Sequence, residues 1–108
     1  MNDPLISPDG TIRVEWSVNT GRMSHEIWSP AIYEAATGKL IADLQDGDLD
    51  AAFTWLEHGT FRFVLRRYSR QGQLSVWMDL PNRRFRIDDG ELEPLELAER
   101  RILKAFPG

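Results

Sequence analysis

Residues 60–88 determine the fold class that we predict, and they read TFRFVLRRYSRQGQLSVWMDLPNRRFRID. Apolar and polar side chains alternate through three short runs, which are separated by Ser69-Arg70-Gln71-Gly72 and by Pro81-Asn82. An alternation with a period of two predicts a β-strand that buries one face. The stretch therefore predicts three consecutive antiparallel strands.

The lengths of the two connections predict a register for these strands. If Tyr68 faces Gln73 and Leu80 faces Arg83, every buried residue meets another buried residue. The buried face then carries two cross-strand rows: Phe63–Met78–Phe85 and Leu65–Val76–Ile87. A slip of one residue would place apolar side chains opposite charged ones, so we expect a well-specified register.

The β pattern continues upstream of this stretch. Ser7-Pro8-Asp9-Gly10 predicts a turn, and the alternation over residues 12–18 predicts a strand. Residues 24–29 are a weaker strand candidate, because Pro30 argues against a place in the middle of a ladder. Residues 32–36 and 39–44 flank Thr37-Gly38 and predict a hairpin.

Two further segments complete the expected fold. Residues 49–56 fit a helix capped by Asp48, and alternatively residues 51–56 fit a strand that turns at residues 57–59. The short run between strands favours the strand. Residues 94–106 predict a helix with the apolar stripe Leu95, Ala98, Ile102 and either Ala105 or Phe106. We expect a single domain over residues 1–108. Its fold is mostly β: an antiparallel meander of about six to eight strands in a curled or partly closed, barrel-like sheet, with one C-terminal helix packed on it.

The composition excludes several chemistries. The chain has no cysteine, which excludes disulfides, thiolate nucleophiles and cysteine-ligated metals and suits a reducing cytosol. No signal peptide and no apolar run of membrane-spanning length is present, so we expect a soluble, cytoplasmic protein. The net charge of −4 argues against general nucleic-acid binding.

The arginines are concentrated in the strands that the opening stretch predicts. Seven arginines and one acid, Asp79, lie between residues 62 and 86, whereas residues 43–57 and 88–99 contain acids and no base. In the predicted register Asp79 faces both Arg62 and Arg84, which would stabilise the sheet by about 0.2–1 kcal/mol per pair. Arg86 over Trp77 would add a cation–π contact of about 0.5–1 kcal/mol. The candidate binding site comprises Arg66, Tyr68, Arg70, Trp77 and Arg86, and the predicted pairings leave Arg66, Tyr68 and Arg70, together with Arg67, for binding.

No residue spacing predicts a catalytic or metal site. Ser24-His25-Glu26 contains the residue types of a hydrolytic triad, but neighbours on a strand point to opposite faces. His58 adjoins a glycine in a predicted turn, and no metal-binding histidine motif is present. The acids around Gly47 do not fit the spacing of an EF-hand calcium loop. We therefore expect no cofactor and no metal.

Three functions remain open on the sequence. The first is a non-enzymatic interaction or accessory module that uses the arginine–aromatic face to bind a partner protein or a second copy of the chain. The second is a small protein that binds a hydrophobic or anionic ligand, with some of its four tryptophans lining a cavity. An enzyme is the least favoured, because no nucleophile or paired carboxylates converge by spacing.

Overall fold

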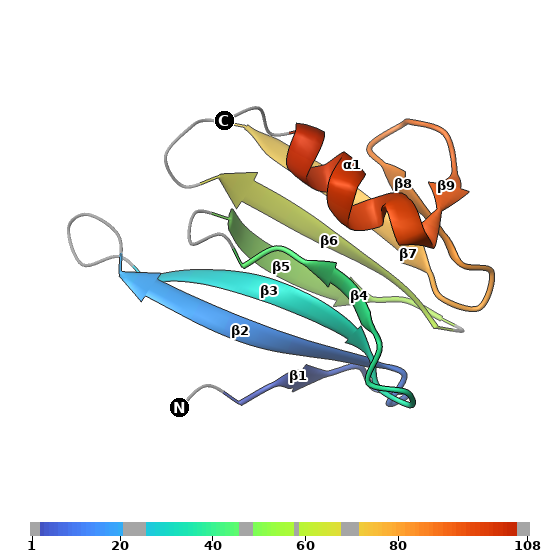
Figure 1. Cartoon of the computed structure of the whole chain (residues 1–108), viewed down its shortest axis with the longest axis horizontal. Helices are drawn as coiled ribbons and strands as arrows, with labels where there is room; N and C mark the ends of the chain where they lie inside the picture. The colour runs from blue at the N-terminus through green and yellow to red at the C-terminus, as the bar shows by residue number, and fades with distance from the viewer. Residues whose placement is uncertain (1–2, 21–25, 46–48, 58, 68–71, 106–108) are drawn as a thin grey trace.

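The computed structural model describes residues 3–20, 26–45, 49–57, 59–67 and 72–105. The described strands form two antiparallel sheets, each a meander in chain order (Figure 1). Sheet A consists of β1 (Leu5–Ile6), β2 (Ile12–Thr20), β3 (Glu26–Glu34) and β4 (Leu40–Asp43). Sheet B consists of β5 (Leu49–Trp55), β6 (Thr60–Arg67), β7 (Gln73–Asp79), β8 (Arg84–Ile87) and β9 (Glu93–Pro94).

This architecture confirms the predicted antiparallel, mostly β fold with one C-terminal helix. Seven of the described strands have four residues or more, within the expected number, and β1 and β9 have two residues each. No hydrogen-bonded ladder joins the two sheets within the described part of the chain, so the sheets are not closed into a barrel.

The two sheets share one core. They approach each other where β3 lies beside β5, and there the buried Ser29 hydroxyl donates a hydrogen bond of 2.6 Å to the backbone oxygen of Leu49. The largest fully buried side chains come from both sheets and from the helix: Phe61, Phe63, Phe85, Ile12, Ile32, Leu44, Leu49, Leu65, Met78, Ile102, Val14 and Val76.

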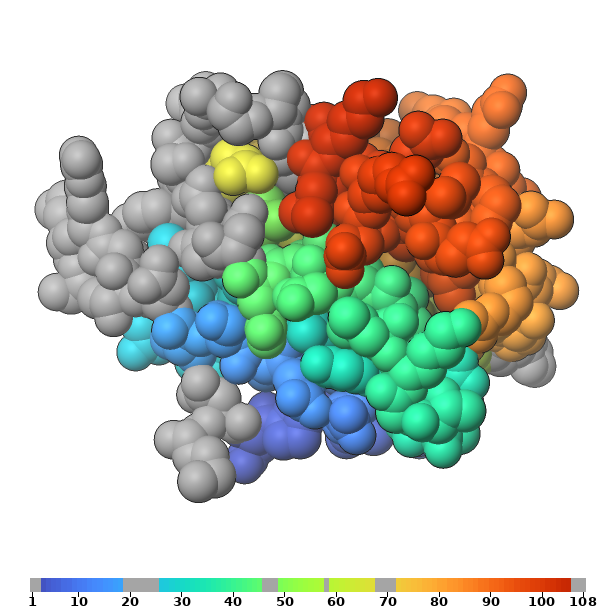
Figure 2. Space-filling view, viewed as in Figure 1, coloured from blue at the N-terminus to red at the C-terminus, as the bar shows by residue number. Residues whose placement is uncertain are grey.

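The C-terminal helix packs between the sheets. A 3₁₀ turn over Leu95–Leu97 leads into α1 (Ala98–Ala105), and Leu95, Ala98 and Ile102 belong to the core. The Glu99 carboxylate accepts a hydrogen bond of 2.7 Å from the backbone N–H of Asp43, at the end of β4. Figure 2 shows α1, in red, seated against the green segment that contains β4. The predicted apolar stripe is thus confirmed for Leu95, Ala98 and Ile102, whereas Ala105 is exposed and Phe106 lies outside the described residues.

Pro30 corrects one prediction. It lies in the middle of β3, so the two strand candidates on either side of it are one nine-residue strand. The carbonyl oxygen of Pro30 accepts a hydrogen bond from the Leu44 N–H, at 2.9 Å, on the β4 side. Within a strand the N–H and C=O of one residue point the same way, so the missing N–H of Pro30 also faces that side. The β3–β4 ladder ends there at Ala31 and Asp43, and the β2–β3 ladder loses no hydrogen bond.

The predicted register is right for β7–β8 and wrong for β6–β7. Met78 faces Phe85 and Val76 faces Ile87, as expected. On the other side, however, Arg66 faces Gln73, so β6 is shifted by two residues from the prediction. A two-residue shift keeps each side chain on its predicted face, because the side-chain period is two. The buried rows are therefore Phe61–Met78–Phe85 and Phe63–Val76–Ile87.

The ambiguous segment before β6 is a strand. β5 is paired with β6 along its whole length, from Leu49 opposite Arg67 to Trp55 opposite Phe61. The predicted hairpin at Thr37-Gly38 is also confirmed: it joins β3 to β4, and Gly38 has a φ of 74°. Strand pairing of this apolar run outweighs the helical spacing of its side chains.

Candidate functional site

The outer face of sheet B carries a row of two arginines and a tryptophan. Arg62 on β6 lies directly opposite Trp77 on β7, and Trp77 lies directly opposite Arg86 on β8. Their side chains point away from the core, since Phe61, Phe63, Val76, Met78 and Phe85 occupy the inner face at alternate positions. We call this row, Arg62–Trp77–Arg86, the Trp77 row.

The side chains of the Trp77 row are available to a ligand. The Arg86 guanidinium carbon lies 5.8 Å from the centre of the Trp77 ring, which confirms the expected cation–π contact. Trp77 is half-buried, whereas Arg62 and Arg86 are exposed. Among the residues that the structure describes, neither arginine forms an ion pair. The C-terminal helix leaves Trp77 uncovered, because the buried residues of the helix join the core on the opposite face of sheet B.

A hollow of about 470 Å³ adjoins the Trp77 row and is bordered by Ser75, Asp88 and Asp89. The Asp88 carboxylate accepts a hydrogen bond of 2.9 Å from the Ser75 N–H, and the Asp88 N–H donates one of 2.7 Å to the Ser75 carbonyl. Asp88 therefore extends the β7–β8 ladder beyond Ile87. The hollow is thus lined by both arginines of the Trp77 row and by two acidic residues.

Asp79 does not bridge two arginines, contrary to the prediction. The two-residue shift of β6 places Thr60, not Arg62, opposite Asp79. Arg84 does lie opposite Asp79, but the buried Asp79 carboxylate instead accepts hydrogen bonds from Asn82, from the backbone N–H at 3.2 Å and from Nδ2–H at 2.7 Å. These bonds stabilise the β7–β8 turn and leave Arg84 without a carboxylate from Asp79.

Arg66, another predicted site residue, does not lie beside Trp77 or Arg86. Arg66 lies opposite Gln73, and its guanidinium forms an ion pair of 3.0 Å with Asp50 on β5. Tyr68 and Arg70 lie outside the described residues. Sequence reasoning missed Arg62, because the predicted register placed it beside Asp79. The register seen in the structure places Arg62 opposite Trp77, and a correct prediction of that register would have identified Arg62 as a site residue.

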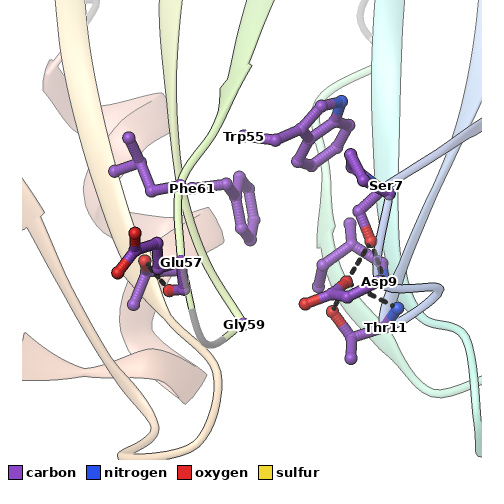
Figure 3. A pocket seen from close by; sticks show the side chains of 11 residues that line it. Ser7, Asp9, Thr11, Trp55, Glu57, Gly59 and Phe61 are labelled. Carbon is purple, nitrogen blue, oxygen red and sulfur yellow. Dashed lines mark hydrogen bonds between the residues drawn. The ribbon is translucent and has the colours of Figure 1, made fainter.

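A second cavity lies between the β1–β2 turn and the β5–β6 turn, and its volume is about 280 Å³ (Figure 3). Its walls are largely apolar and include Ile12, Trp55 and Phe61. Of the four tryptophans, Trp55 alone lines this cavity among the described residues. Trp55 also stacks on Phe53, with ring centres 5.6 Å apart and planes at 22°.

Two acidic residues, Asp9 and Glu57, line this second cavity, and Asp9 lies in the β1–β2 turn. One carboxylate oxygen of Asp9 accepts hydrogen bonds from the Ser7 hydroxyl at 2.8 Å, the Thr11 hydroxyl at 2.7 Å and the Thr11 N–H at 3.1 Å. The bonds from Thr11 and Ser7, together with one from the backbone of Gly59, lower the pKa of Asp9 from its ordinary 3.8 to about 2. The predicted turn at residues 7–10 is confirmed, and the Gly10 N–H donates a hydrogen bond of 2.9 Å to the Ser7 carbonyl.

A shallower hollow of about 520 Å³ adjoins the same turns. Asp9, Thr11 and Gly59 border both this hollow and the second cavity. On its other side Arg83 forms an ion pair of 2.9 Å with Glu34, which links sheet B to sheet A. The guanidinium group of Arg83 is thus already paired within the protein.

The described residues contain no group of three histidines or acids that could hold a metal ion. Ser24, His25 and His58 lie outside the described residues. No helix in the described part of the chain is long and apolar enough to cross a membrane. Comparisons with protein-family models, curated proteins and solved structures find no match to this chain.

Proposed function

We propose that this chain is a non-enzymatic binding module whose Trp77 row binds an acidic segment of a partner protein. The observation that supports it is the juxtaposition of Arg62, Trp77 and Arg86 on one open face, with both guanidinium groups free of ion pairs to described residues. Tryptophan and arginine are the side chains that most often dominate the binding energy of protein interfaces.

The chemistry of the row selects an anion. A guanidinium group donates two parallel hydrogen bonds to a carboxylate, and such charge-assisted bonds are about twice as strong as neutral ones. Arg62 and Arg86 stand on the two strands that flank β7, so their backbones are about 9–10 Å apart. An extended peptide places the side chains of residues i and i+2 about 7 Å apart on one face. Two acidic residues of the peptide at positions i and i+2 can therefore reach Arg62 and Arg86, whose long side chains are flexible. The peptide backbone between them would then lie over Trp77.

The rim of the hollow favours a peptide over a nucleic acid. Asp88 and Asp89 border the Trp77 row, and Glu91 follows shortly after in the sequence. A nucleic acid carries a phosphate at every nucleotide and would place some of them near these carboxylates. A peptide with two carboxylates avoids this repulsion. The net charge of −4 disfavours a polyanion for the same reason.

A peptide-binding experiment tests this proposal. The probe is a fluorescein-labelled peptide of alternating glutamate and alanine, and its control is the same peptide with glutamine in place of glutamate. We expect saturable fluorescence anisotropy with the glutamate peptide only. The double variant Arg62→Ala/Arg86→Ala weakens binding at least tenfold, whereas Arg100→Ala, which removes an exposed arginine from α1, changes it less than twofold.

Three results would contradict the proposal. The first is equal binding of the glutamate and glutamine peptides, and the second is equal binding to the native chain and the double variant. The third is a single-stranded oligonucleotide that binds more tightly than the glutamate peptide, which would assign the face to nucleic acid. Thermal unfolding of the double variant separates a lost contact from a lost fold, since removing exposed arginines is expected to change stability by about 1 kcal/mol or less.

A further inference from the structure

The cavity between the β1–β2 turn and the β5–β6 turn has a different chemistry from the Trp77 row and shares no residue with it. Aromatic rings and a carboxylate border the same small space. In Figure 3 the ring of Phe61 points from β6 into the gap between the turns, and Asp9 lies across the gap from it. No described residue that lines the cavity is basic.

We propose that this cavity binds a small organic ammonium ion, held by the ring of Trp55 and by the carboxylate of Asp9. The electron-rich faces of aromatic rings attract ammonium groups, and tryptophan attracts them most strongly. A carboxylate beside such rings adds a direct charge pair. The methyl or methylene groups of the ion meet the apolar wall of the cavity, to which the exposed side chain of Leu56 contributes.

The volume of the cavity restricts the size of this ligand. At about 280 Å³ it is just below the range of roughly 300–1,000 Å³ that suits drug-sized molecules. A compact ammonium ion such as tetramethylammonium or choline is of the appropriate size. A bare metal ion is disfavoured, because no three metal-ligating side chains converge in the described part of the chain.

The position of Asp9 fits it for this role. Ser7 and Thr11 direct their hydrogen bonds to a single oxygen of the carboxylate, which fixes its orientation. The carboxylate is exposed, so a charged ligand reaches it without crossing the core. An aspartate is ionised at neutral pH, and the same hydrogen bonds lower its pKa further.

A pair of ligands of equal shape tests the proposal. Choline carries the charge, and 3,3-dimethylbutan-1-ol is its uncharged counterpart. We expect choline to shift the NMR resonance of the Trp55 indole N–H saturably, with the neutral alcohol at least tenfold weaker. Trp55→Leu weakens choline binding at least fivefold, whereas the matched loss of an outer-face tryptophan, Trp77→Leu, changes it less than twofold.

The Asp9→Asn variant separates charge from structure. It weakens choline binding at least fivefold and leaves the weaker binding of the alcohol unchanged, whereas a collapsed cavity would weaken both. If this variant does not fold, the comparison of the two ligands on the native chain decides alone. Equal affinity for choline and the alcohol, or no saturable shift with choline, would overturn the proposal.

Discussion

Asp79 and Asn82 are joined by two hydrogen bonds, one to the backbone N–H of Asn82 and one to its side-chain amide. Asp79 is 8% exposed, so these bonds satisfy a carboxylate that has little access to water. They also leave Arg84, which lies directly opposite Asp79 in the sheet, without this carboxylate as a partner. The Asp79 carboxylate therefore stabilises the β7–β8 turn rather than pairing with an arginine across the sheet.

Replacement of Asp79 by alanine is expected to destabilise the fold by about 1–3 kcal/mol, because it leaves the Asn82 donors without their acceptor. Urea denaturation measures the loss. The control is Arg84→Ala, directly opposite in the sheet, which should change stability by about 0.5 kcal/mol or less. Similar losses in the two variants would show instead that Asp79 and Arg84 stabilise each other as an ion pair.

Gly59 is expected to tolerate alanine less well than Gly10 does. Both glycines have a positive φ, of 72° and 75°, which costs an alanine about 1–2 kcal/mol. At Gly59 the added Cβ would also lie 3.0 Å from Cδ of Pro81, whereas at Gly10 it meets no atom within 4 Å. Gly59→Ala should therefore be less stable than Gly10→Ala by about 1 kcal/mol or more. Thermal unfolding of both variants measures the difference, and equal stabilities would show that the β5–β6 turn is not packed against Pro81.

The stability of the chain is expected to depend on the ionisation of Asp9. The pKa of Asp9 is lowered to about 2 in the folded protein, so the folded state favours the charged form. Its contribution is complete above the ordinary value of 3.8 and is lost as the pH falls through about 2. Because Asp9 is exposed, solvent screening limits this contribution to about 1 kcal/mol or less.

Urea midpoints at pH 6, 4, 3 and 2 test this dependence. The native chain should exceed Asp9→Asn in stability at pH 6, and the difference should shrink between pH 4 and pH 2. Asp89→Asn controls for the change in net charge. A difference that grows as the pH falls would contradict the sign of the pKa shift.

The helix is expected to be essential to the core. Ile102 is fully buried, and Ile102→Ala should cost about 2–5 kcal/mol. Its neighbour Leu103 is 36% exposed, and Leu103→Ala should cost much less. Chemical denaturation of the two variants gives the comparison. Equal losses would mean that α1 presents a different face to the sheets.

The sequence predicted the strands, the buried face and the helix, because each follows from local periodicity. It did not predict the register of β6 against β7, since a period of two is unchanged by a shift of two residues. The consequence for the site was large: the shift moves Arg62 from Asp79 to Trp77. Pro30 was misread for a related reason, because the harm that a proline does depends on which side of the strand its missing N–H faces.

The second cavity was beyond sequence reasoning altogether. Asp9 and Phe61 are 52 positions apart in the printed sequence, and no local pattern connects a turn of sheet A with a strand of sheet B. Their proximity follows from the packing of the two sheets. The signal within reach was the turn at Ser7-Pro8-Asp9-Gly10, which fixes the position of the carboxylate but not the residues that face it.

The most direct test of the proposed binding face is the NMR resonance of the Trp77 indole N–H during titration with the glutamate–alanine peptide. The chain has four tryptophans, and the Trp77→Phe variant assigns the resonance by its loss. We predict that the Trp77 resonance shifts saturably while those of Trp16 and Trp55, on the core side of the sheets, stay in place. A Trp77 resonance that does not move, or shifts confined to the other tryptophans, would contradict the assignment of this face.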